Sequence, residues 1–180
     1  NNEIYDRAID HAGMSRFVEE SIQTDTNRIV RRHESRLRKI FKGKNPFSSK
    51  VMAKQVEPEV LRFTRELDTS LNSKMKEVAL LESDFQTNNL NKSLGKIANI
   101  KRTAASKTLE DLVGANIQND TLSKHVKNIG NSELVRIKGA IKKGIAEGTP
   151  QAAMIDEVMG KTKLTRAQAS ALVRTSITRT

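Results

Sequence analysis

The sequence predicts an all-α protein with a long helical arm or hairpin followed by a small domain of several helices. Apolar residues recur at spacings of three and four through most of the chain, which is the periodicity of amphipathic helices. No stretch shows convincing period-two alternation, as a half-buried β-strand would. Aromatic residues make up only 3% of the 180 residues and Trp is absent, so few large side chains are available for a wide core. We therefore expect elongated helices that bury narrow seams.

The first long helix is predicted over residues 15–41, and a shorter helix that ends at Gly13 is expected before it. One face of the long helix carries residues spaced by three or four: Val18, Ile22, Thr26, Ile29, His33, Leu37 and Ile40. His33 falls within this stripe, so we interpret it as a seam or interface side chain rather than a metal ligand or a base. The segment from Gly43 to Pro46 should end the helix, because proline cannot continue one.

A second long helix is predicted to begin near Glu57, with Pro58 in its first turn. Its apolar stripe consists of Val60, Phe63, Leu67, Leu71, Met75, Val78, Leu81 and Phe85. At about 1.5 Å per residue this stripe spans roughly 40 Å. A stripe so long and narrow needs a partner helix, so we expect these residues to form a helix-pairing interface. The first helix is the nearest candidate partner, and neighbouring copies in a homo-oligomer are the next.

The rest of the chain is predicted to contain shorter elements. The Asn-rich stretch 87–91 should break the second helix, and residues 94–106 are interpreted as a linker or an irregular helix. Short helices are then expected over 108–117, 120–128, 132–147, 150–159 and 165–180. The chain should accordingly form two units, an elongated arm of residues 1–100 and a C-terminal domain of residues 101–180.

Helix boundary signals are densest between residues 132 and 180. The predicted helix 132–147 has one apolar face, made of Leu134, Ile137, Ile141 and Ile145. Gly148 stands at a C-cap position, and the Thr-Pro pair after it suits the N-cap and first turn of the next helix. That short helix should end at Gly160. After a basic linker, Thr165 and Gln168 are predicted to form a capping box for the last helix.

The order of these elements, together with Arg166-Ala167 and the run from Leu172 to Thr175, resembles the phage Mu F-like head morphogenesis (minor head protein) family. The family motif usually has a Glu after Arg-Thr, where this chain has Ser176, and further residues usually follow it. We therefore expect the C-terminal domain to be truncated. The resemblance implies a virion protein of the capsid interior or portal vicinity, made in the host cytoplasm. Such a protein would act with the portal or other head proteins in head assembly, and a role in DNA ejection is open.

The net charge of +11 is unevenly distributed. Residues 28–54 hold ten basic side chains and one acidic one, and residues 91–180 hold sixteen basic and seven acidic ones, whereas residues 1–27 hold two basic and six acidic ones. Basic blocks suit the backbone of packaged double-stranded DNA, an acidic portal surface, or the acidic blocks of other copies. Contact with DNA should be non-specific, because interleaved aromatics and a helix-turn-helix pattern are missing. The candidate contact residues are Arg28, Arg31, Arg32, Arg36, Arg38, Lys39, Lys142, Lys143, Arg166 and Arg174.

No enzymatic activity is expected. The three histidines are scattered without metal-ligand spacing, and the sequence has no P-loop or G-x-S-x-G motif, so we expect no catalytic residue, cofactor or metal. Cysteine is absent, which excludes disulfides, and no apolar run approaches the roughly 20 residues of a membrane span. Two alternatives to a head protein stay open. One is a basic helical DNA-binding protein without a capsid role, and the other is a non-catalytic module of a larger toxin or enzyme.

Overall fold

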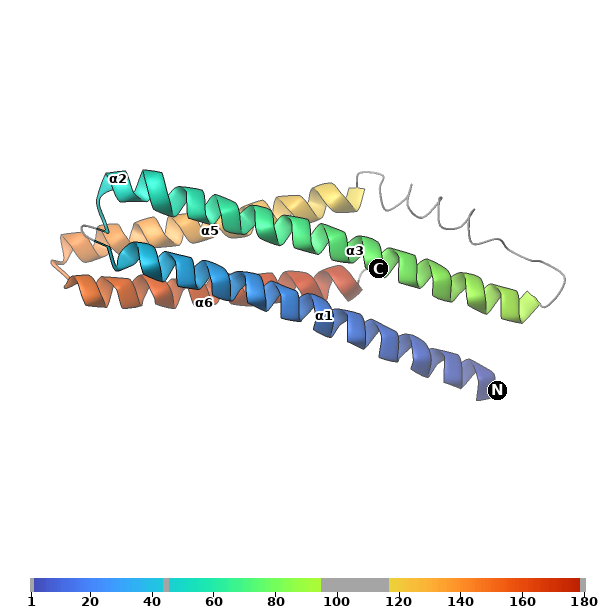
Figure 1. The fold of residues 1–180 in the computed structure, drawn as a ribbon. Coiled ribbons are helices and arrows are strands. Elements are labelled where there is room, and N and C mark those ends of the chain that lie inside the picture. The colour runs from blue at the N-terminus through green and yellow to red at the C-terminus, as the bar shows by residue number, and fades with distance from the viewer. Residues whose placement is uncertain (1, 44–45, 95–116, 179–180) are drawn as a thin grey trace.

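The computed structural model describes residues 2–43, 46–94 and 117–178, and these residues form helices and no strand, which confirms the all-α prediction. The long helices are α1 (Asn2–Phe41), α3 (Glu57–Leu94), α5 (Ile117–Ala146) and α6 (Gln151–Thr178). Figure 1 shows them side by side in alternating directions, with α1 packed on α3 and α6, and α5 packed on the same two helices. The described residues thus form an up-down-up-down four-helix bundle in which α1 and α5 lie on a diagonal.

The corner between α1 and α3 follows the predicted stop signals. Helix α1 ends at Phe41, as expected from the glycine and proline that follow it. A short helix α2 (Ser49–Val51) then begins with Ser48 as its N-cap, whose Oγ accepts a hydrogen bond from the Val51 amide at 3.3 Å. It passes through a π-helical segment η1 (Met52–Val56) into α3. The chain is therefore already helical before Glu57, where the second helix was predicted to begin.

Two predicted breaks in the first half of the chain are wrong. Helix α1 runs without interruption through Gly13, so the expected separate helix before residue 15 does not exist. Helix α3 continues through the Asn-rich stretch 87–91 to Leu94. Glycine and asparagine in a helix cost at most about 1 kcal/mol each, which packing readily outweighs. The linker expected at 94–106 and the helix expected at 108–117 fall largely outside the described residues.

Two predicted breaks in the second half are also wrong. The helices predicted over 120–128 and 132–147 are one helix, α5, which ends at Ala146, and those predicted from 150 and from 165 are joined in α6, which is described as far as Thr178. Thr165 consequently lies in the middle of α6, fully buried, and does not form the predicted capping box. The turn at Gly148 is confirmed: this glycine has a φ of 63°, in the left-handed region that favours glycine.

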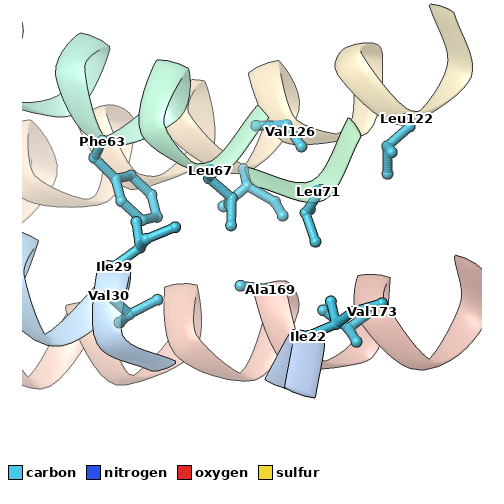
Figure 2. Packing of buried hydrophobic residues seen from close by; sticks show 11 residues of the cluster. Ile22, Ile29, Val30, Phe63, Leu67, Leu71, Leu122, Val126, Ala169 and Val173 are labelled. Atoms are coloured by element: carbon cyan, nitrogen blue, oxygen red, sulfur yellow. The ribbon is translucent and has the colours of Figure 1, made fainter. Parts of the chain in front are cut away.

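The core of the bundle consists of two clusters of buried apolar residues. The first draws on all four long helices and contains Ile22, Ile29, Val30, Phe63, Leu67, Leu71, Leu122, Val126, Ile129, Ala169 and Val173. Figure 2 shows these side chains converging between the helices. The second lies towards the α1–α2 corner and contains Leu37, Phe41, Met52, Val56, Val60, Ile137, Ala140, Ile141, Val158 and Met159. The predicted boundary at residue 100 lies outside the described residues, but helices from both sides of it share these two clusters.

The residues of the predicted helix-pairing stripe occupy different environments along α3. Val60, Phe63, Leu67 and Leu71 are buried in the two clusters, and Met75 and Val78 pack against the first one. Leu81 is exposed, and the Phe85 ring lies 4.8 Å from the ring of His11 in α1. On α5, Ile137 and Ile141 are buried and Leu134 is partly buried, whereas Ile145, expected on the same face, is exposed. None of the helices in the described ranges is long and apolar enough to cross a membrane.

Candidate functional site

Positive charge gathers at one end of the bundle, where α1 ends, α2 begins and α5 turns into α6 (Figure 1). The residues of this basic end, 28–43, 46–66 and 130–166, include 18 Lys or Arg and 8 Asp or Glu. The remaining described residues hold 8 Lys or Arg and 11 Asp or Glu. The alternating directions of the helices cause this separation, because they bring the basic block of residues 28–54 beside the basic end of α5.

Six of the predicted contact residues are exposed at the basic end and form no ion pair with the described acidic residues. They are Arg31, Arg32, Arg38, Lys39, Lys142 and Lys143. The first four belong to α1 and the last two to α5, which is diagonally opposite. These cations therefore lie around the end of the bundle instead of forming one flat patch. A polyanion that approaches from one direction would contact only some of them.

The other four predicted contact residues are engaged or placed elsewhere. Arg28 pairs with Asp25 of the same helix at 2.7 Å. Arg36 binds two α3 carboxylates, those of Glu59 at 2.6 Å and Glu66 at 3.0 Å. Arg166 of α6 donates to Glu34 of α1 at 2.6 Å, and so joins two helices. Arg174 lies in the other half of the bundle, on the last turns of α6.

A buried charge cluster lies just inside the basic end. His33 of α1 is fully buried between two carboxylates: Nδ1 lies 3.0 Å from Glu59 Oε1 on α3, and Nε2 lies 3.1 Å from Glu133 Oε2 on α5. Its ring also stacks on Phe63, with ring centres 4.4 Å apart. A neutral imidazole has only one N–H, so only the imidazolium form can donate to both carboxylates. A charged His33 thereby ties α1, α3 and α5 together.

The pKa values in this cluster follow from its geometry. Burial is the largest influence on His33 and by itself lowers the pKa, but the hydrogen bonds and charges of Glu133 and Glu59 together raise that pKa above its ordinary value. For Glu59, burial likewise raises the pKa, and the hydrogen bonds and charges of His33 and Arg36 together lower it below its ordinary value. Both shifts favour the charged forms, as expected for a paired buried network.

The cluster is a structural feature and lacks the geometry of a metal or catalytic site. The two carboxylates approach opposite nitrogens of the His33 ring, so they cannot share one ion with it. No group of three potential ligands with metal-binding geometry occurs in the described parts of the chain. His33, Glu59 and Glu133 are also all buried, which leaves them out of reach of a substrate.

Comparison of this chain with known protein families, with curated proteins and with solved structures finds no match.

The apolar stripe of the sequence predicts a seam position for His33 but not its two partners. One signal was present: Glu133 lies between Ile129 and Ile137 at spacings of four, so a carboxylate interrupts an apolar stripe. The three residues meet only through the tertiary fold, because Glu133 is 100 residues from His33 in the sequence.

Proposed function

We propose that this protein is a non-catalytic structural protein of a phage head, and that its basic end contacts the backbone of packaged double-stranded DNA. The observation that carries the DNA contact is the set of exposed cations around one end of the bundle, which lack acidic partners among the described residues. The assignment to a head rests on the resemblance of residues 132–180 to the Mu F-like family. A portal or another head protein with an acidic surface is the second expected partner of the same cations.

The chemistry of the basic end favours backbone contact over base recognition. Lysine and arginine neutralise phosphates and release counterions, so binding should weaken steeply with salt, with a slope of about −0.9 for each phosphate contacted. The described residues offer no exposed aromatic side chain near these cations for stacking on bases. Duplexes of different sequence should therefore bind with similar affinity.

DNA binding is tested by fluorescence anisotropy with a labelled duplex at several salt concentrations. Replacing Arg38 and Lys39 with alanine should weaken binding and reduce the salt slope by about 0.9 for each phosphate that is no longer neutralised. The matched control is the pair Lys124→Ala and Lys127→Ala, which removes the same charge from exposed positions on the opposite half of α5. Equal reductions in affinity for both double variants would show that net charge, and not the basic end, governs binding.

The head assignment is tested independently of DNA affinity. Mass spectrometry of purified phage particles should detect the protein in full virions. Its loss from particles that have released their DNA would indicate an internal protein that leaves with the DNA, and its retention would indicate a fixed head or portal component. Absence from both preparations would contradict the head assignment and leave the alternative of a DNA-binding protein without a capsid role.

A further inference from the structure

The N-terminal half of α1 exposes an apolar surface that the bundle does not use. Ile9 and Phe17 are 69% and 73% exposed, and they lie on one side of the helix with Gly13 midway between them. A Cβ added at Gly13 would meet no atom within 4 Å, so the space outside this glycine is open. We call the surface formed by Ile9, Gly13 and Phe17 the α1 face. The surrounding segment, residues 2–27, is acidic by sequence, with six Asp or Glu and two Lys or Arg.

The C-terminal half of α5 carries a surface with matching features. Val135 and Ile145 are 69% and 59% exposed, with Gly139 and Lys142 between them in the sequence. Gly139 and Lys142 follow Val135 by one and two turns on its side of the helix, whereas Ile145 lies about 80° around the helix from Val135. Open space again surrounds the glycine, because a Cβ at Gly139 would meet no atom within 4 Å. We call the surface formed by these four residues the α5 face. It belongs to the basic end of the molecule.

We propose that the α1 face of one copy docks on the α5 face of a second copy of this chain. Each face has two exposed apolar side chains and an open glycine one turn from one of them, which permits close approach of two helices. The charges are complementary, since one face lies in an acidic segment and the other carries lysine at the basic end. Ile9 and Phe17 lie about two turns apart on one side of α1, and so differ from the single exposed apolar side chains found on any protein surface.

The geometry makes this contact head-to-tail. The two faces belong to opposite halves of an elongated bundle, so each copy offers a free α5 face after its α1 face is bound (Figure 1). A heterologous contact of this kind produces rings or open chains of subunits rather than a closed dimer. The proposal concerns self-association alone and does not depend on DNA binding or on a place in a phage head.

The test uses substitutions that block docking without harming the monomer. Gly13→Leu and Gly139→Leu each place a side chain in open space on a helix and raise helix propensity, so the bundle should fold at least as well. Gly160→Leu is the matched control, because this helical glycine of α6 also has open space around its Cβ position. Masses are measured by sedimentation on nuclease-treated protein over a range of concentrations.

The average mass of the wild type and of Gly160→Leu should rise with concentration and fall with added salt, while Gly13→Leu and Gly139→Leu remain at the monomer mass of 20.1 kDa. An equimolar mixture of Gly13→Leu and Gly139→Leu should reach twice that mass and no more, because each variant retains the face that the other lacks. A monomeric wild type would overturn the proposal. So would glycine variants that assemble like the wild type, or a mixture that stays monomeric.

Discussion

His33 contacts carboxylates from two helices, so its charge is coupled to the packing of α1 on α3 and α5. The pKa of His33 is higher in the folded state than its value of 6.5 in the unfolded chain. The stabilisation from its charge is therefore fully present below pH 6.5 and is lost as the pH rises through the pKa of the folded state. The pKa of Glu59 is lower in the folded state than its value of 4.5 in the unfolded chain. Its contribution to stability is therefore fully present above pH 4.5 and is lost as the pH falls through the pKa of the folded state. The two groups favour the folded state together between these limits.

The free energy of unfolding should therefore be highest in a window that includes pH 4.5 to 6.5 and extends beyond both values. Urea denaturation between about pH 3 and pH 10 measures this profile. The double variant His33→Gln/Glu133→Gln serves as the control, since it removes the imidazolium together with the carboxylate that would otherwise stay buried and unpaired, and should lose the decline on the alkaline side. A wild-type profile that declines identically to that of the double variant would show that His33 is not responsible.

Removing the His33 charge should also be costly at neutral pH. His33→Gln leaves Glu133 fully buried without a cationic partner, and breaking a buried pair in this way costs about 3–5 kcal/mol. Adding Glu133→Gln to this variant should recover part of the stability, because it neutralises the orphaned carboxylate. The control His125→Gln changes an exposed histidine and should alter stability by less than about 0.5 kcal/mol. Chemical denaturation of the four proteins compares these values.

At the scale of elements, the sequence predicted helices well and their interruptions poorly. The stop before Pro46 and the turn at Gly148 were predictable, since proline cannot continue a helix and Gly148 adopts a positive φ. The breaks predicted at Gly13 and Gly160 rested on glycine propensities of only about 1 kcal/mol. At Gly160 the burial of Val158, Met159 and Thr162 exceeds this cost, and at Gly13 one glycine is not enough to end a helix of 40 residues. The basic residues of the candidate site were visible in the sequence, but their ion pairs depended on neighbours that only the tertiary fold supplies.

Gly130 lets α5 approach α3 closely. Replacing a helical glycine with alanine usually stabilises a protein, but at this position it should be destabilising. A Cβ at this position would overlap the hydroxyl oxygen of Thr64, so Gly130→Ala should destabilise the bundle by about 1–3 kcal/mol, although alanine favours helices. Combining it with Thr64→Ala removes the overlapping atom and should restore most of the stability. Gly160→Ala should instead stabilise by up to about 1 kcal/mol, since its Cβ would meet open space. Thermal denaturation of these variants distinguishes close packing from propensity.

At the scale of the whole molecule, the two core clusters join α1 and α3 to α5 and α6, so the bundle should unfold as one unit. Leu71→Ala on α3 and Ile137→Ala on α5 lie on opposite sides of residue 100 and should each cost about 2–5 kcal/mol. Each should move a single calorimetric transition to lower temperature, with the calorimetric enthalpy equal to the van't Hoff enthalpy. An arm of residues 1–100 that folded independently would give a different result: Ile137→Ala would split the transition and leave the helical signal of α1 and α3 in place. Following helicity by circular dichroism alongside the calorimetry decides between one cooperative bundle and two separate units.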